Sequence, residues 1–284
     1  RPPRSTLFPY TTLFRSLGRQ HENDREATAA DLKWLADPAE EPEPFGDGGT
    51  KMAWNTFNVV SIYPNGNPVM SDVNQRWVGD CCACAVIASM AYLYPRFVKH
   101  IIKDNMDKTY TVTMYDPKGK QISVGVGGDY FIGNSGDLGA LGGRNKEVTW
   151  ATILEKAMIK WNQIYQGSSN VGGIGTEYVS AIFTGDGESV GFGANALIAE
   201  DLQRAVEVSL KQGRLVIGGF TRSGEQVDQN WQTTSGHAFT FILPDDNTHL
   251  FKMRNPWGGT TDGVMKVRSE EHTSELQSPF YLVC

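Results

Sequence analysis

Two side chains of this sequence, a cysteine and a histidine, lie in local settings that could support nucleophilic catalysis. Cys81 follows Gly79 and Asp80 and opens the apolar run CCACAVIASMAYLY, so we expect it in the first turn of a buried helix that Asp80 caps. Unpaired backbone N–H groups and the positive end of the helix dipole favour a thiolate there. His237 follows a glycine at the start of the apolar strand AFTFIL, where its imidazole could face a cleft.

A third segment, KMRNPWGG at residues 252–259, is a charged and aromatic turn directly after a predicted strand. The side-chain carbonyl of Asn255 could orient an imidazole, as the third group of a nucleophile and base pair does. Taken singly, each segment also fits a structural role: a buried inert thiol, a hydrogen-bonded core histidine or an Asx turn. Because Cys81 and His237 are far apart in the sequence, only the tertiary fold can bring them together.

The elements that would position these residues divide the sequence into two halves. Apolar residues recur every three or four positions over Trp150–Tyr165, which predicts an amphipathic helix whose apolar stripe faces the core. Residues 110–114 and 121–126 alternate in polarity on either side of a turn at 116–119, which predicts a hairpin. A glycine-rich stretch at 185–195 is typical of a boundary between lobes.

The second half is richer in strands. We expect an amphipathic helix over 197–212, followed by strands at 215–220, 238–243 and 250–253. Residues 36–50 mix Pro, Glu and Gly, a composition that cannot bury enough apolar area to order itself, so we expect a linker or a mobile extension. The pattern therefore predicts an α+β chain with a helical lobe before a β-rich lobe.

Both ends of the sequence read as translated sequencing adapters. These segments are 1–16 (RPPRSTLFPYTTLFRS) and 268–284 (RSEEHTSELQSPFYLVC), and we expect neither to be native. The rest is expected to divide into an N-terminal extension or linker at 17–52, a helical lobe with the nucleophile at 53–188, and a truncated β-rich lobe at 189–267.

The charge balance argues against nucleic acid and anionic membranes as partners. The chain has 26 Lys and Arg against 32 Asp and Glu, a net charge of -6 at pH 7. It has no run of about 18 apolar residues, and its start lacks the pattern of a secretory signal. We therefore expect no nucleic-acid partner, no membrane partner and a cytoplasmic location, and the oligomeric state stays open.

The clustered cysteines allow further interpretations. Apart from Cys284, the chain has Cys81, Cys82 and Cys84, which form no disulfide framework and favour a reducing compartment. The Cys81 and Cys84 spacing fits a thioredoxin-like redox motif, but that class would leave His237 without a role. A structural zinc site would need a second ligand pair, which the histidines do not supply. A reversible disulfide between Cys81 and either neighbour is a hypothesis for control by oxidation.

Together and in this order, the segments NQRWVGDCCAC, SGHAF and RNPWG resemble the calpain-like cysteine proteases, and WATILEKAMIK is similar to a helix that this family places between its Cys and His segments. The resemblance implies that Cys81 is the nucleophile, that His237 is the general base and acid, and that Asn255 orients His237. It also implies that Gln75 and the Cys81 backbone form the oxyanion hole, and that Trp257 shields the His and Asn pair.

The resemblance further implies an α+β, papain-like core of two lobes and a cysteine endopeptidase that acts on protein or peptide substrates through a thioester. That chemistry needs no cofactor, and calcium is expected only as a regulator. The sequence departs from the family at Cys82, where an aromatic residue is usual, and it lacks a second Trp and Gly pair after Gly258. Two alternatives stay open: a catalytically inactive calpain-like interaction domain, and an acyl transferase resembling transglutaminase, which would place Asp where Asn255 stands.

Overall fold

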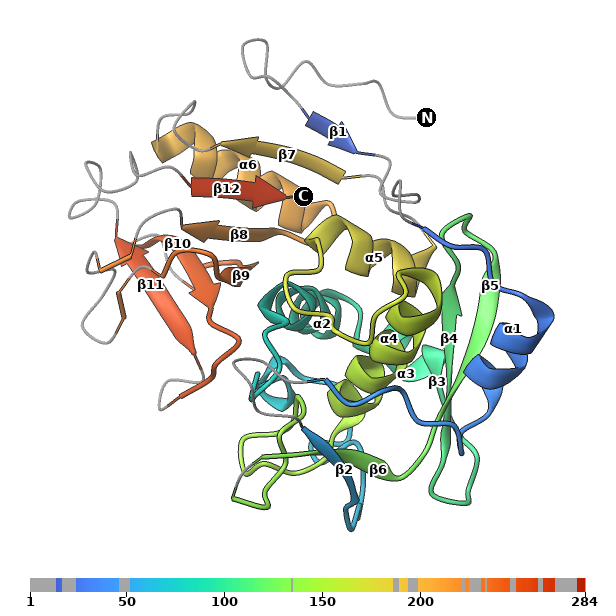
Figure 1. Ribbon diagram of the computed structural model, residues 1–284. Coiled ribbons are helices and arrows are strands. Elements are labelled where there is room, and N and C mark those ends of the chain that lie inside the picture. Colours follow the sequence, from blue (N-terminus) through green and yellow to red (C-terminus); the bar gives the residue numbers. More distant parts are fainter. Residues whose placement is uncertain are drawn as a thin grey trace.

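The chain folds into a helical lobe and a β-rich lobe that lie side by side (Figure 1). The architecture is α+β, as the sequence predicts. The computed structural model describes residues 14–16, 24–45, 52–133, 135–185, 189–193, 199–220, 223–224, 231–232, 234–245, 249–259, 263–268 and 280–283.

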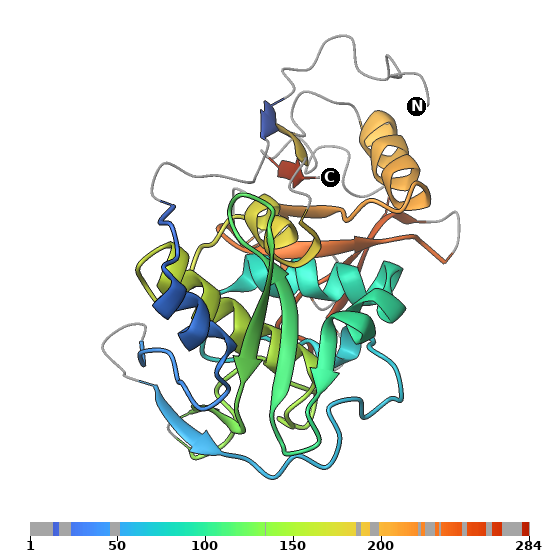
Figure 2. The ribbon, with the colours of Figure 1, turned by 90° about the vertical axis from the view of Figure 1, so that its right-hand side faces the viewer.

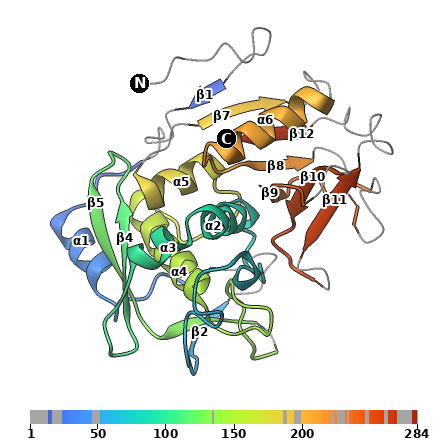
Figure 3. The ribbon, with the colours of Figure 1, turned by 180° about the vertical axis from the view of Figure 1, so that it is seen from behind.

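Two buried helices form the centre of the helical lobe, α2 (Cys81–Leu93) and α4 (Trp150–Tyr165). Helix α2 runs between α4 and the β-rich lobe (Figure 3), and its residues from Ala83 to Ala91 are all buried, which explains why it is apolar on every side. Helix α4 begins after Thr149, whose hydroxyl accepts a hydrogen bond from the N–H of Ala151. The lobe also contains α1 (Ala29–Ala36), a 3-10 turn (Met70–Asp72), α3 (Pro95–Ile101) and α5 (Thr176–Thr184).

Two small antiparallel sheets complete the helical lobe. One pairs β2 (Ala53–Thr56) with β6 (Asp129–Ile132), and the other has the order β3 (Ile102–Asp104), β4 (Tyr110–Tyr115), β5 (Gln121–Val126). Buried and half-buried residues alternate along β4 because one face of this sheet packs on α4 and α5. Figure 2 shows the three-stranded sheet in green across the near side of the lobe, with α1 in blue beside it.

The β-rich lobe is built on one antiparallel sheet with the strand order β1-β7-β12-β8-β9-β10-β11. Helix α6 (Ala199–Lys211) contacts β10. Strands β1 and β12 lie in the two segments that read as translated adapters, whose origin stays a prediction. The strands are β1 (Phe14–Ser16), β7 (Ser189–Gly193), β8 (Ile217–Phe220), β9 (Ala238–Ile242), β10 (His249–Arg254), β11 (Val264–Arg268) and β12 (Phe280–Val283).

The two lobes meet where α2 packs against β9. Every residue of β9 is buried, so apolar side chains lie on both faces of the strand instead of alternating with exposed polar ones. The Thr240 hydroxyl donates to the carbonyl oxygen of Ala85 on α2 at 2.7 Å, and the buried guanidinium of Arg254 donates to the carbonyl oxygen of Val73 at 2.7 Å. These polar contacts fix the register between the lobes, which apolar packing alone would leave free to slide.

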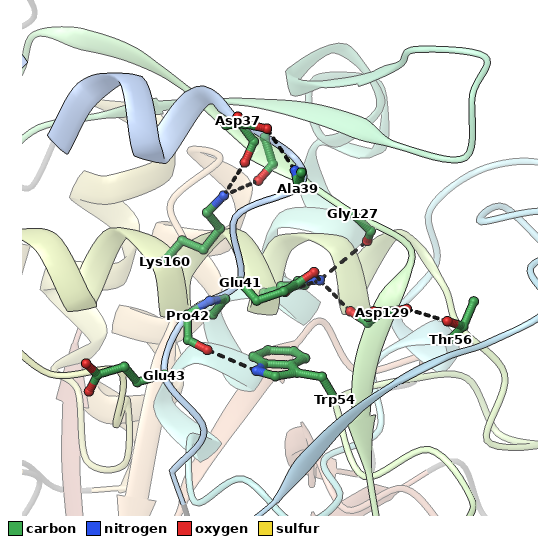
Figure 4. Close-up of polar contacts among 12 residues, drawn as sticks. Asp37, Ala39, Glu41, Pro42, Glu43, Trp54, Thr56, Gly127, Asp129 and Lys160 are labelled. Carbon is green, nitrogen blue, oxygen red and sulfur yellow. Dashed lines mark hydrogen bonds and ion pairs between the residues drawn. The ribbon is translucent and has the colours of Figure 1, made fainter. Parts of the chain in front are cut away.

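Residues 37–45, for which composition predicts a linker, instead lie along α4 (Figure 4). Lys156 of α4 forms an ion pair with Glu41 at 2.6 Å, and Lys160 donates to the carbonyl oxygen of Asp37 at 2.8 Å. Both lysines are buried, and a buried ammonium group must be paired or hydrogen-bonded. The expectation of a mobile extension is therefore wrong for these residues, because their order depends on partners far away in the sequence; residues 46–50 lie outside the described part.

Helix α1 belongs to the same lobe. Thr28 and Asp31 form a capping box at its start, and Leu35 is completely buried against the core. The helix contacts β5 and α4. The region predicted as an N-terminal extension thus contributes a helix to the helical lobe, while the predicted domain boundaries stay a prediction.

Most predicted elements form close to their expected positions. The helices over 81–94 and 150–165 and the hairpin at 110–126 are confirmed. Helices α3 and α5 were not predicted, because each is short and spans at most nine residues. The predicted start of α6 at 197 lies outside the described residues. Within the described ranges no single helix is long and apolar enough to cross a membrane, and the pair α2 and α3, which reaches that length together, is bent by 114°.

Candidate active site

Cys81 is the first residue of α2, at the junction of the two lobes. Its thiol is half-buried, and the sulfur lies 4.0 Å from the carbonyl oxygen of Gly236 in the β-rich lobe. Asp80 occupies the N-cap position, since its carbonyl oxygen accepts the first helical hydrogen bond from the Cys84 N–H at 3.0 Å. Asp80 is thus the N-cap residue, as the sequence predicts, although its side chain makes no capping hydrogen bond.

His237 reaches the site from the other lobe, directly before β9. Its ring is buried, and Nε2 lies 2.8 Å from Oδ1 of Asn255. The backbone N–H of Trp257 donates to the same Oδ1 at 3.0 Å. Because an N–H can only donate, this contact identifies the Asn255 atom as the oxygen, so Nε2 of His237 must donate to it and Nδ1 is left to face the Cys81 sulfur.

The turn after β10 holds Asn255 in this orientation. Its N–H donates to the carbonyl oxygen of Gly263 at 2.7 Å, and its carbonyl oxygen accepts from the N–H of Gly258 at 3.1 Å. Gly258 has a φ of +69°, and a Cβ there would lie 2.2 Å from Oδ1 of Asn74, so a side chain does not fit. The segment is therefore an Asx turn, and the oxygen that makes the turn also binds His237.

Two aromatic rings flank His237. The Trp257 ring stacks on the imidazole with centroids 4.3 Å apart and a 30° tilt, and the Phe239 ring meets it edge-on at 5.0 Å. Trp257 is itself half exposed, so one ring face covers the imidazole while the other meets solvent. Trp257 therefore lies against the His237 ring, and its expected role as a shield of the His237 and Asn255 pair stays a prediction.

The surroundings of Cys81 favour its thiolate. A hydrogen bond from the Cys82 thiol lowers the pKa of Cys81 most, followed by a hydrogen bond from His237, a hydrogen bond from the Ala238 N–H and the charge of His237; these outweigh burial, and the pKa falls to about 4. The same contact and burial raise the pKa of Cys82, so its thiol keeps its proton and can donate. Sequence reasoning missed this role of Cys82, and the only signal was the departure from the family's aromatic residue.

Gln75 lies on the seam between the lobes. Its backbone N–H donates to the carbonyl oxygen of Pro256 at 2.8 Å, one residue from Asn255. Its side-chain Nε2 donates to the carbonyl oxygen of Val78 at 2.8 Å. An amide nitrogen carries two hydrogens, so one N–H of Gln75 is left for a further acceptor. That is the minimum that the expected oxyanion role requires.

The remaining thiol is set apart from this chemistry. Cys84 is fully buried, and its sulfur lies 3.3 Å from Oδ1 of Asp80. All three cysteines of the cluster are free thiols, and the hypothesis of a reversible disulfide stays a prediction. In the part of the chain that the structure describes, no three His, Cys, Asp or Glu side chains gather into a group that could hold a metal ion.

The fold thus brings Cys81, His237, Asn255 and Trp257 together, with Gln75 bonded to the turn that carries Asn255. A comparison with protein-family models matches residues 52–272 to the family described as calpain family cysteine protease. The matched range contains all five residues. A search of curated proteins gave no match.

Proposed function

Because the chain belongs to the calpain family of cysteine proteases, with the α+β papain-like core of two lobes, we propose that it is an endopeptidase that uses Cys81, His237 and Asn255. The observation that carries the proposal is that the Cys81 sulfur lies 4.0 Å from the carbonyl oxygen of Gly236, the residue before His237, whose Nε2 lies 2.8 Å from Oδ1 of Asn255. This arrangement supports the roles of nucleophile, base and orienting group that acyl transfer by a cysteine enzyme uses.

In the acylation step, the Cys81 sulfur attacks the carbonyl carbon of the scissile peptide bond and forms a C–S bond. The carbonyl oxygen becomes an oxyanion, which the Cys81 backbone N–H and the free amide N–H of Gln75 would stabilise by about 10²–10³-fold per donor. His237 then transfers its Nδ1 proton to the leaving nitrogen, and the C–N bond breaks. Protonation of that poor leaving group contributes about 10²–10⁴-fold.

Deacylation returns the site to its starting state. Neutral His237 takes a proton from water, the resulting hydroxide attacks the thioester carbon, and the C–S bond breaks with Cys81 leaving as a thiolate. Asn255 accepts the Nε2 hydrogen bond throughout, so the ring keeps the tautomer and orientation that both proton transfers need. Trp257 limits exchange of this hydrogen bond with water.

The substrate in this proposal is an extended protein or peptide segment lying between the lobes. We propose to test it with a fluorescently labelled unfolded protein and with wild-type chain, Cys81→Ser and His237→Ala. Wild-type chain should release internal fragments, and both variants should be inactive while remaining folded by circular dichroism. His100→Ala is the matched control, because His100 is exposed on α3 in the helical lobe.

The test also separates the protease from the inactive interaction domain. If folded wild-type chain releases no fragments and Cys81 reacts with iodoacetamide no faster than an ordinary thiol, the catalytic proposal fails. Hydrolysis that continues in Cys81→Ser would place the activity elsewhere. Release of single residues from one end would support an exopeptidase and contradict the endopeptidase assignment.

Calcium enters the proposal only as a regulator. The described residues do not offer a cluster of acidic side chains that would hold it, so no step of the reaction is assigned to the ion. We propose to compare hydrolysis with added calcium and with a strong chelator. Equal rates would exclude calcium as a regulator of hydrolysis and would leave the proposed roles of the five site residues unchanged.

A further inference from the structure

The turn after β10 lies against the short segment of the helical lobe that ends at Gln75. The guanidinium of Arg254 donates from Nη2 to the carbonyl oxygen of Val73 at 2.7 Å and to Oδ1 of Asn74 at 3.3 Å. In the middle of the turn, the carbonyl oxygen of Pro256 accepts from the N–H of Gln75 at 2.8 Å. The turn that orients the imidazole is therefore bonded directly to the segment that carries the expected oxyanion donor.

Asn74 is the centre of this contact, because it is also fixed to the helical lobe. Its backbone N–H and its side-chain Nδ2 both donate to the carbonyl oxygen of Gly142, at 2.9 and 3.0 Å. Nδ2 also donates to the carbonyl oxygen of Ser71 at 2.8 Å, so both of its hydrogens are used and Oδ1 is the atom that faces the β-rich lobe. A Cβ on Gly258 would lie 2.2 Å from that Oδ1. The start and the end of the turn thus both lie against one oxygen atom.

Arginine suits this position better than another cation would. Arg254 is 1% exposed, so its hydrogen bonds are made away from water. Nη2 carries two hydrogens, one for each of the two acceptors, and a hydrogen bond from a charged donor is about twice as strong as a neutral one. A planar guanidinium fixes the direction of both bonds, whereas an ammonium group on a flexible stem does not. The contact is therefore directional as well as strong.

We propose that Arg254 and Asn74 are positioning residues that hold the imidazole-orienting turn against the segment that carries Gln75. They thereby set how the general base and the oxyanion donor lie relative to each other. The proposal rests on the proposed function, because acyl transfer is the task that His237 and Gln75 would share. In acylation the Gln75 amide must meet the oxyanion while His237 protonates the leaving nitrogen, and a misplacement of about 1 Å can cost about 10²-fold in rate.

Other contacts hold the two lobes together farther along α2. Thr240 of β9 donates to the carbonyl oxygen of Ala85 at 2.7 Å. The Tyr92 hydroxyl accepts from the N–H of Leu243 at 3.3 Å. Because these bonds and the packing of α2 on β9 do not involve Arg254, its loss should loosen the turn without separating the lobes.

Substitutions at residue 254 separate a positioning role from a general contribution to stability. Arg254→Met keeps a long side chain but has no donor, and Arg254→Lys keeps the charge and a donor without the planar fork. Lys252→Met is the matched control, because Lys252 lies on the same strand and forms its ion pair with Asp245 inside the β-rich lobe. If Arg254→Met does not fold, Asn74→Ala takes its place, since it keeps the buried guanidinium and its bond to Val73.

The first measurement is native-state hydrogen exchange of the whole chain, resolved to single residues by mass spectrometry, which requires no activity. In Arg254→Met, the N–H groups of Gln75 and Gly258 should exchange about tenfold faster, because both donate to carbonyl oxygens of the turn. Amides in the middle of α4 should exchange at the wild-type rate, and Lys252→Met should leave all of these rates unchanged. Unchanged exchange at Gln75 in a folded variant, or an equal increase throughout α4, would overturn the proposal.

The second measurement is hydrolysis of the labelled unfolded protein, with kcat and KM determined separately. Arg254→Met should lower kcat about 10- to 100-fold at little change in KM, and Arg254→Lys should lose less. In a chain that already carries Gln75→Ala, the further loss from Arg254→Met should be less than about threefold, because the donor that it positions is absent. Losses that multiply would refute an action through Gln75.

The two measurements also distinguish this proposal from the proposed function. A wild-type chain that hydrolyses no protein, in which Arg254→Met still speeds exchange at Gln75, would refute the protease and leave the contact between the lobes standing. An active wild-type chain in which folded Arg254→Met changes neither exchange nor kcat would refute the positioning role and leave the protease standing.

Discussion

Replacing His237 by alanine should shift the pH dependence of Cys81 alkylation in a way that the structure allows to be calculated. The Cys81 pKa of about 4 lies about five units below the ordinary thiol value of 9.0, and His237 contributes a hydrogen bond and a positive charge to that difference. The Cys82 thiol remains in the variant, so five units is the upper limit of the shift. The midpoint of the profile should therefore move to higher pH.

The size of the change follows from two opposing effects. At pH 6 a full return to 9.0 would reduce the thiolate fraction about 1000-fold. The more basic thiolate is also the better nucleophile, and a Brønsted slope of about 0.4–0.5 over five units raises its intrinsic rate about 100- to 300-fold. At pH 6 the variant should thus react about 3- to 10-fold more slowly, whereas at high pH it should react faster than wild-type chain.

The assay is the rate of iodoacetamide modification of Cys81 from pH 4 to pH 10, mapped by mass spectrometry, with His100→Ala as the control. The two rate profiles should cross. The alkylation rate at high pH, where Cys81 is fully ionised, should be higher in His237→Ala, and more so the further the midpoint has moved. A folded His237→Ala chain with an unchanged midpoint would show that His237 does not act on the Cys81 sulfur. A raised midpoint without a higher alkylation rate at high pH would contradict the reasoning that the more basic thiolate is the better nucleophile.

Further substitutions at Gln75, Asn255, Thr240 and Leu35 test the geometry. Gln75→Ala should lower turnover about 10²-fold at unchanged thermal stability; equal turnover would remove Gln75 from the oxyanion hole. Asn255→Ala should lower kcat about 10- to 100-fold, and Asn255→Asp, which keeps the acceptor, should lose less; the reverse order would argue against orientation of the imidazole. Thr240→Val should lower the free energy of unfolding by about 1 kcal/mol in urea titrations. An unchanged free energy would show that the hydrogen bond from Thr240 to α2 does not stabilise the fold. Leu35→Ala should cost about 2–5 kcal/mol in the same assay, and Lys33→Ala, exposed on the same helix, should cost little; equal costs would show that α1 does not pack as described.

The site residues could be read from the sequence because each has a local signature. The glycine and acid before Cys81, the glycine before His237 and the RNPWG turn around Asn255 are short patterns with few alternatives, and their order identified the family. The helix that carries the nucleophile was equally legible, since its apolar run begins at Cys81 and ends before Pro95. Such features depend on residues a few positions apart, where backbone geometry leaves little freedom.

The sequence was least informative about polar groups that find their partners in the core. Composition predicted a mobile linker at 37–45, but Lys156 and Lys160 of α4 bind that segment. Asp80 is the N-cap residue, yet its side chain is buried and makes no capping hydrogen bond. Composition was misleading at 37–45 because a buried ammonium group must be paired or hydrogen-bonded, and this segment supplies the partners of Lys156 and Lys160.

By itself, the sequence indicated the two-lobe α+β class, the main helices and strands, and the family with its candidate reactive residues. Only the tertiary structure decided that one oxygen of Asn255 serves both its own turn and His237, and that Lys156 and Lys160 hold residues 37–45 on α4. The physical reason is that the energy of a buried polar group depends on which other groups the packed lobes bring within about 3 Å of it. The partners of these polar groups are set when the elements of the core pack together, so no local sequence pattern predicts them.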